Sequence, residues 1–215
     1  MNMEITKIAD FKVNGRGTAP AWEKTQWLPM SPVGSHQADY PTRTKVLYSD
    51  TGLYFLVDCE DRKLDCTGLK DFDNLYTEDV VEVFLWPDTS QNLYFEYEIS
   101  PLGAELPILV ANNNGRFFGW LPWHYKDGRR THKATSVRGG RKEAGASVTG
   151  WTVEFFIPYN LLVGLGNTPP KPGTHWRGNI YRIDHEKRGH PFQWAWCSKI
   201  NDFHDFKNFG TLVFR

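Results

Sequence analysis

Short runs of alternating apolar and polar residues recur along this chain, and turn-forming residues separate them. In Tyr94–Ile99, Phe95, Tyr97 and Ile99 point to one face and the residues between them to the other. The 19 glycines and 13 prolines are spread along the chain, which suits many short strands and leaves no long helical pattern. We therefore predict an all-β fold, a two-sheet antiparallel β-sandwich with one or two short helical turns, one of them at Tyr159–Leu162.

The length and charge of the chain narrow its organisation and its partners. At 215 residues one core suffices, so we expect a single domain over residues 1–215, acting as a monomer. Lysine plus arginine and aspartate plus glutamate are 25 each, so no net charge favours nucleic acid or an anionic membrane. Met1–Asp10 lacks the apolar region of a signal peptide, which makes cytoplasmic the default location. The three cysteines, Cys59, Cys66 and Cys197, have no metal-type spacing and allow at most one disulfide.

Several strands can be placed from their alternation, and two of them carry glutamates. In Asp79–Trp86 the side chain of Glu82 falls on the less apolar face, and in the next strand Glu96 and Glu98 point outward. The nine tryptophans exceed what the core needs, so some of them are expected to face solvent. The aromatic cluster Trp120–Tyr125 either forms one wall of a binding cleft or covers a sheet edge. The remaining predicted strands are Val46–Tyr48, Leu53–Val57, Leu106–Ala111, Trp151–Ile157, His175–Asp184 and Phe209–Phe214.

Two blocks of sequence together resemble the family 9 carbohydrate-binding modules. The first is Tyr76–Leu85 followed by Tyr94–Glu98, and the second is Asn179–Asp184, then Trp196 and Phe203–Leu212. The early Trp22 and the hairpin at 46–55 also fit, so the likeness extends over nearly the whole chain. It implies an immunoglobulin-like or DOMON-like sandwich that binds sugar without catalysis and is linked to polysaccharide breakdown through attached glycoside hydrolases.

Carried over by position, the resemblance implies a sugar held between Tyr76 and Phe203, with the motif glutamate kept as Glu82. Two positions depart from it, because Glu96 stands where sugar-binding members carry arginine and Tyr181 where they carry glutamine. The family's calcium sites depend on acidic residues in the first turn, which here is Val13–Gly17, so calcium is not carried over and no cofactor is expected.

The candidate residues offer the two kinds of group that a sugar requires. Flat rings can bury the C–H-rich faces of a pyranose, and carboxylates or guanidinium groups can hydrogen-bond its hydroxyls. The predicted carbohydrate-binding set is Tyr76, Phe203, Glu82, Glu96, Tyr181, Glu98, Arg182 and His204.

Each member of this set also has a structural interpretation. The rings can close the edge of the sandwich, and the glutamates can form a solvated strand face paired with Arg182 or with lysines. His204, beside Asp205, can be a structural histidine.

Two other functions remain as alternatives. A glycoside hydrolase would use Glu82 with Glu96 or Glu98, but an exposed strand is a poor place to raise the pKa of a general acid. A haem-binding DOMON-type domain would need a methionine ligand, and Met1, Met3 and Met30 are the only methionines. No serine triad order, zinc motif, phosphate loop or dinucleotide fingerprint is present in the sequence, so we expect binding rather than catalysis.

Overall fold

A computed structural model describes residues 1–35, 38–113, 115–186 and 189–215, and within them the regular structure is β-strand apart from short 3-10 turns. The described strands are β1 (Asn2–Lys7), β2 (Leu28–Val33), β3 (Thr42–Tyr48), β4 (Gly52–Glu60), β5 (Val80–Trp86), β6 (Leu93–Ile99), β7 (Glu105–Asn113), β8 (Arg116–Pro122), β9 (His132–Arg138), β10 (Gly150–Pro158), β11 (His175–Asp184), β12 (Phe192–Ala195) and β13 (Gly210–Phe214).

The all-β prediction is confirmed, but the number of helical turns was underestimated. The described turns are η1 (Pro20–Lys24), η2 (Leu75–Thr77), η3 (Asp127–Arg129), η4 (Tyr159–Leu162) and η5 (Phe206–Asn208). Only η4 was predicted, with these same bounds. The other turns lie in loops, where a single i to i+3 turn leaves little periodic signal in the sequence.

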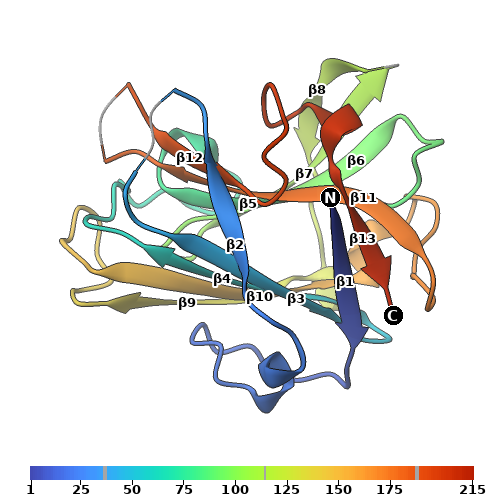
Figure 1. Cartoon of the computed structure of the whole chain (residues 1–215), viewed down its shortest axis with the longest axis horizontal. Helices are drawn as coiled ribbons and strands as arrows, with labels where there is room; N and C mark the ends of the chain where they lie inside the picture. The colour runs from blue at the N-terminus through green and yellow to red at the C-terminus, as the bar shows by residue number, and fades with distance from the viewer. Residues whose placement is uncertain (36–37, 114, 187–188) are drawn as a thin grey trace.

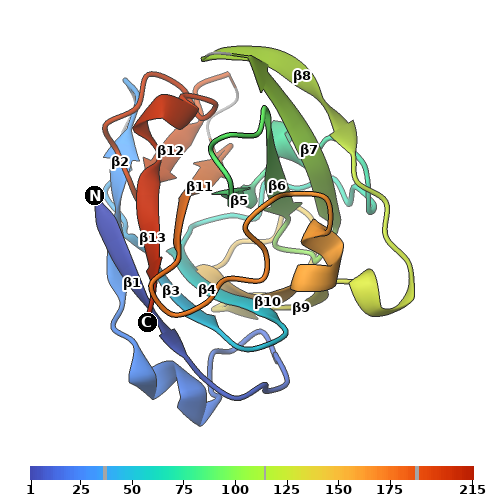
Figure 2. The same ribbon diagram turned by 90° about the vertical axis from the view of Figure 1, so that its right-hand side faces the viewer.

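Hydrogen bonds join the strands into one path, β8-β7-β6-β5-β11-β12-β2-β3-β4-β10-β9, with β1 and β13 beside it. The path folds back on itself, so that β5, β6 and β11 form a layer over β3, β4 and β10 (Figure 1, Figure 2). The predicted division into two separate antiparallel sheets is not confirmed, because β1 and β2 each join both layers. Leu28–Met30 of β2 pairs with β3 while Ser31–Val33 pairs with β12, and β1 runs parallel to both β13 and β3.

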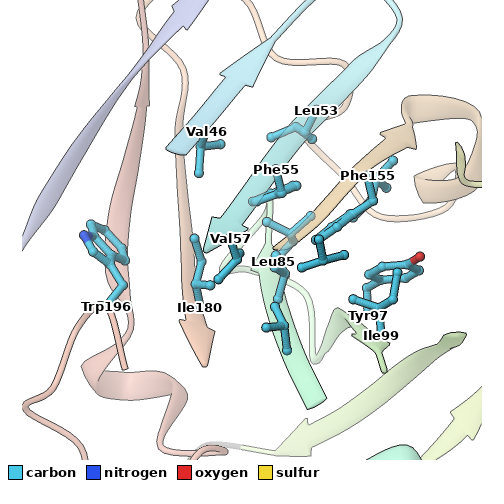
Figure 3. Close-up of a cluster of buried hydrophobic side chains, with 14 of the residues drawn as sticks. Val46, Leu53, Phe55, Val57, Leu85, Tyr97, Ile99, Phe155, Ile180 and Trp196 are labelled. Carbon is cyan, nitrogen blue, oxygen red and sulfur yellow. The ribbon is translucent and has the colours of Figure 1, made fainter. Parts of the chain in front are cut away.

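The predicted strands occupy their predicted places because their alternation is real. The hairpin at 46–57 corresponds to β3 and β4, joined by a turn in which the Ser49 N–H donates to the Gly52 carbonyl over 2.9 Å. Apolar residues of one parity on β3, β4, β5, β6, β10 and β11 meet between the layers and form the main core, which Figure 3 shows around Phe55, Phe155 and Tyr97. Trp194 and Trp196 share that parity and are both buried there.

The other faces of β5, β6, β7 and β11 support a second cluster of buried residues, which includes Phe84, Tyr94 and Tyr181. Loops at 72–78 and 200–209 contribute Leu75, Phe203 and Phe206 to this cluster and so cover that face of the sheet. These two loops determine where the candidate site lies and how deeply it is buried. Among the described residues, no helix has the length and apolarity to cross a bilayer.

Candidate functional site

Three glutamates lie together on the outer face of β5 and β6. Glu82 of β5 pairs in register with Glu98 of β6, and Glu96 lies two residues earlier on the same face of β6. Only 2%, 4% and 1% of Glu82, Glu96 and Glu98 are exposed, respectively. Their outward orientation was predicted correctly, but the solvated strand face was wrong, because the loops described above bury it.

These glutamates form the floor of a cavity of about 260 Å³, which we call the glutamate pocket. Its rim holds Tyr76 of η2, Phe203 from the loop before η5, and Trp120 of β8. Tyr76 is 41% exposed and Phe203 is half-buried, and both line the cavity, so the two predicted aromatic residues do reach it. His204 completes the lining together with Ile183, which has the same parity on β11 as Tyr181.

Tyr181 lies behind this wall and is fully buried. Its ring stacks on Phe203, with centroids 4.0 Å apart and an interplanar angle of 11°. Its hydroxyl donates to the Phe203 carbonyl over 3.0 Å, and this bond ties the loop to the sheet. Tyr181 therefore holds a ring of the pocket in place.

His204 is held from two sides. Its Nδ1 lies 2.6 Å from the Tyr94 hydroxyl, and its ring stacks on Phe117 of β8 with centroids 4.4 Å apart. Nδ1 is also 4.0 Å from Oε2 of Glu96. Burial lowers the pKa of His204, which favours the neutral imidazole. His204 therefore has the structural role considered from the sequence and also lines the pocket.

The glutamates are electrostatically frustrated. One carboxyl oxygen from each lies within 4.8 Å of the others. Glu96 and Glu98 hydrogen-bond to each other, and Oε2 of both is buried without a donor from the surrounding protein. Burial and the neighbouring glutamate charges raise the pKa values of Glu82 and Glu96 well above the ordinary value. Burial raises the pKa of Glu98 to about 8. The sequence argument against a raised glutamate pKa here was therefore wrong, since it assumed an exposed strand.

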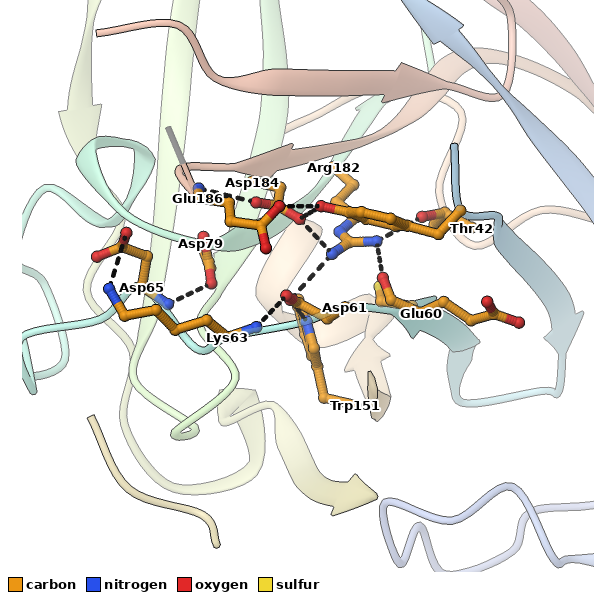
Figure 4. Close-up of polar contacts among 12 residues, drawn as sticks. Thr42, Glu60, Asp61, Lys63, Asp65, Asp79, Trp151, Arg182, Asp184 and Glu186 are labelled. Carbon is orange, nitrogen blue, oxygen red and sulfur yellow. Dashed lines mark hydrogen bonds and ion pairs between the residues drawn. The ribbon is translucent and has the colours of Figure 1, made fainter. Parts of the chain in front are cut away.

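Arg182 does not belong to this pocket. It points from the opposite face of β11 into the molecule, where it is fully buried (Figure 4). Its Nη2 donates to Asp61 over 3.0 Å and to Asp184 over 2.8 Å, and its Nη1 donates to Thr42 over 2.9 Å. Its prediction as a sugar ligand or a partner of the glutamates fails because adjacent strand residues point to opposite faces.

A larger hollow of about 820 Å³ lies on the far side of the molecule, over β4, β9 and β10. Three of its five charged side chains pair with one another: Asp58 lies 3.0 Å from Arg43 and 2.6 Å from Arg138. Among the described residues, the buried carboxyl oxygens without a donor from the surrounding protein are in the glutamate pocket, which we therefore take as the candidate site.

The loop at 13–17 points backbone N–H groups at a buried carboxylate. The backbone N–H groups of Asn14 and Gly15 each donate to the Glu154 carboxylate over 2.8 Å, and the Trp22 indole donates to its other oxygen over 2.8 Å. The loop therefore presents donors to a buried anion, whereas a calcium ion needs oxygen ligands.

The aromatic residues at 120–125 do not act as one unit. Trp120 lines the glutamate pocket, as the cleft interpretation required. Trp123 instead packs against the main core, and its indole donates to the Leu161 carbonyl over 2.8 Å. Ile183 was missed, although its parity with Tyr181 on one strand was a usable signal.

Comparisons with known proteins agree on one family. The family model described as "Carbohydrate family 9 binding domain-like" matches residues 13–215. A Bacteroides uniformis protein provisionally assigned to carbohydrate binding aligns over 100% of this chain and 99% of its own, with a TM-score of 0.78 and 15% identity.

A family 9 carbohydrate-binding module from Caldicellulosiruptor kristjanssonii is similar in its complexes with cellotriose and with glucose. Each aligns over 100% of this chain at a TM-score of 0.70 and 14% identity, covering 94% and 96% of the neighbour, respectively. No curated protein sequence matches.

Proposed function

The chain belongs to the carbohydrate family 9 binding domain-like family, and we propose that it binds saccharide in the glutamate pocket without catalysing a reaction. This membership confirms the resemblance of the motifs at 76–98 and 179–212. The observation that carries the site is the pocket itself, where Tyr76, Phe203 and Trp120 border three buried carboxyl groups.

The rings and carboxyls supply complementary parts of a sugar site. Apolar ring faces can bury the C–H side of a pyranose, and the carboxyl groups can accept or donate hydrogen bonds to its hydroxyls. At ~25 cal/mol per Å² of buried apolar area, two ring contacts are worth on the order of a few kcal/mol before ordering costs. The expected binding is specific but modest.

The structural neighbours support a glucose-type partner. The Caldicellulosiruptor module has been crystallised with cellotriose and with glucose, and its fold covers this whole chain. By analogy we propose a mono- or oligosaccharide partner, a link to polysaccharide breakdown and no binding of nucleic acid, which the zero net charge supports.

The organisation that accompanies this function is also a proposal. We infer one domain over residues 1–215 with a DOMON-like sandwich arrangement of its two layers, supported by the main core between them. A monomer suffices, because the pocket is built within one chain. The loop at 13–17 is proposed to hold no calcium, since its donors engage Glu154.

The rival functions receive no comparable support. Hydrolysis needs two carboxyl groups with pKa values pushed apart, one acid and one ionised. Here the pKa values of Glu82, Glu96 and Glu98 all shift upward together. Met30, the candidate haem ligand, is packed in the main core.

The test is calorimetric titration of the protein with glucose and with cello-oligosaccharides. Tyr76→Ala and Phe203→Ala are each expected to weaken binding about tenfold, because each removes roughly 1–2 kcal/mol of ring contact. Phe118→Ala is the matched control, since Phe118 on β8 is 60% exposed and does not line the pocket. Unchanged affinity in both pocket variants, with native unfolding transitions, would place the sugar elsewhere.

A further inference from the structure

The glutamate pocket gathers three carboxyl groups, and among the described residues no lysine or arginine lies within ion-pair distance of them. Among the described residues, the one ion-pair contact of Glu82, Glu96 or Glu98 is His204 Nδ1, at 4.0 Å from Glu96. That nitrogen is already engaged with the Tyr94 hydroxyl at 2.6 Å. Oε2 of Glu96 and of Glu98 is buried without a donor from the surrounding protein, and the two carboxyl groups share a hydrogen bond with each other. A proton shared between two carboxyls supplies only one donor, so these buried oxygens can accept another from a ligand.

The geometry of the floor matches one kind of donor. An alkylammonium group has three N–H donors and no acceptor, and here three carboxyl groups offer oxygens within 4.8 Å of one another. Charge-assisted hydrogen bonds of this kind are roughly twice as strong as neutral ones. A neutral hydroxyl could satisfy one or two of these oxygens, but it brings no compensating charge.

The residues that line the pocket favour an organic cation over a metal ion as its ligand. Calcium takes about 6–8 oxygen ligands and magnesium about six in a near-octahedral shell. Around the three carboxyls the cavity is lined by the rings of Tyr76, Trp120 and Phe203 and by Ile183, which offer few oxygens. These surfaces suit a carbon skeleton, and aromatic faces attract an ammonium group.

We propose that the glutamate pocket selects a pyranose bearing a cationic amino group, the class of 2-amino-2-deoxy sugars, over the neutral sugar of the same skeleton. This inference rests on the proposed saccharide-binding function and specifies its substrate class. The amino group lies against Glu82, Glu96 and Glu98, and the ring of the sugar lies against Tyr76 and Phe203.

Binding of an amino sugar should release protons from the glutamates. Burial raises the carboxyl pKa values in the free protein, which favours the protonated forms of the three glutamates. An ammonium group favours their ionised forms, so binding transfers protons from the carboxyls to the buffer while the amine keeps its own. A neutral sugar provides no such charge and releases few protons.

The experiment uses three β-1,4-linked disaccharides that differ only at C2. They are the dimer of glucosamine, its N-acetylated form and cellobiose, titrated calorimetrically near pH 6 in two buffers of different ionisation enthalpy. We expect the amino dimer to bind at least about tenfold more tightly than the other two and to release protons.

Glutamine variants test whether the carboxyl charge is responsible for the preference for the amino sugar. Glu96→Gln keeps the shape of the side chain and is expected to weaken amino-dimer binding about tenfold and cellobiose binding by a smaller factor. Glu98→Gln serves as a second variant should Glu96→Gln fold poorly. Glu143→Gln is the control, since Glu143 is exposed in the loop before β10 and should change neither affinity.

The outcomes separate this inference from the function on which it rests. Cellobiose or the N-acetylated dimer binding as tightly as the amine would overturn the inference and leave saccharide binding intact. Failure of all three to bind would overturn both. Calcium or magnesium chloride alone binding to the protein, with loss in Glu96→Gln and no preference for the amine, would make the pocket a metal site and also overturn the inference.

Discussion

Replacing Glu98 by glutamine should remove part of a pH dependence built into the stability of this protein. Burial raises the pKa of Glu98 from 4.5 to about 8. The folded state therefore binds this proton more tightly than the unfolded state does. The resulting stabilisation is fully present below about pH 4.5 and is lost as the pH rises through about 8.

The size of this stability change follows from the pH range between the pKa of Glu98 in the unfolded chain, 4.5, and in the folded protein, about 8. Between about pH 5 and pH 7 the unfolded chain has released this proton and the folded chain retains it, so each pH step subtracts up to about 1.4 kcal/mol. The ceiling is roughly 3 kcal/mol over that window, and relaxation around the buried group lowers it to roughly 1–3 kcal/mol. For a chain of this size each kcal/mol corresponds to about 2–4 °C in Tm.

The assay is thermal and urea unfolding of the wild type and Glu98→Gln at several pH values from about 5 to 8. Between about pH 5 and pH 7 the free energy of unfolding of the wild type should fall by roughly 1–3 kcal/mol more than that of the variant. Glutamine keeps an acceptor oxygen for the Tyr76 backbone N–H, which hydrogen-bonds this side chain. Asp79, whose pKa burial also raises to about 8, leaves a residual slope in both proteins. Equal slopes in the two proteins, with Glu143→Gln as the surface control, would refute the assignment.

Two further predictions concern the scaffold. Arg182→Met should reduce the free energy of unfolding by about 3–5 kcal/mol in urea titrations at neutral pH, because Asp61 and Asp184 remain buried without their cation. The control is Arg43→Met, which removes a half-exposed pair with Asp58 and should cost about 1 kcal/mol or less. Similar losses in the two variants would contradict this reasoning. Gly52→Ala should lower stability by roughly 1–3 kcal/mol, because its Cβ would lie 2.3 Å from the Ile157 carbonyl oxygen, whereas Gly128→Ala meets no atom within 4 Å and should be nearly neutral in the same denaturation assay.

Strand periodicity predicted β3–β7, β10, β11 and β13, whereas β1, β2, β8, β9 and β12 were not predicted. β11 and η4 have their predicted bounds, and β5, β6, β10 and β13 begin or end within one residue of theirs. The pairings of β1 and β2 could not be predicted, since a six-residue strand gives no sequence signal for which neighbour it joins. The turns η1, η2, η3 and η5 were missed because a single 3-10 turn leaves little periodic signal in the sequence.

The candidate site was predicted in its members but not in its environment. Parity correctly placed Glu82, Glu96 and Glu98 on one outward face, and the motif correctly placed Tyr76 and Phe203 near them. Parity also excludes Arg182 from that face, a step that the sequence interpretation did not take. What periodicity cannot show is that loops far along the chain fold over the face, so the burial of the glutamates and their raised pKa values were not foreseen.

The burial of three carboxyl groups on one sheet face is an argument about function as well as stability. Placing Glu82, Glu96 and Glu98 under loops disfavours their ionised forms, and apolar residues of similar size would pack there without that penalty. Arg182 shows how this chain treats buried charge elsewhere, since Asp61 and Asp184 lie within 3.0 Å of it. The glutamate pocket, by contrast, opens to solvent beside Tyr76, so a ligand can supply what the scaffold does not. A frustrated acidic cluster at the base of an aromatic-lined cavity is therefore better explained by binding than by folding.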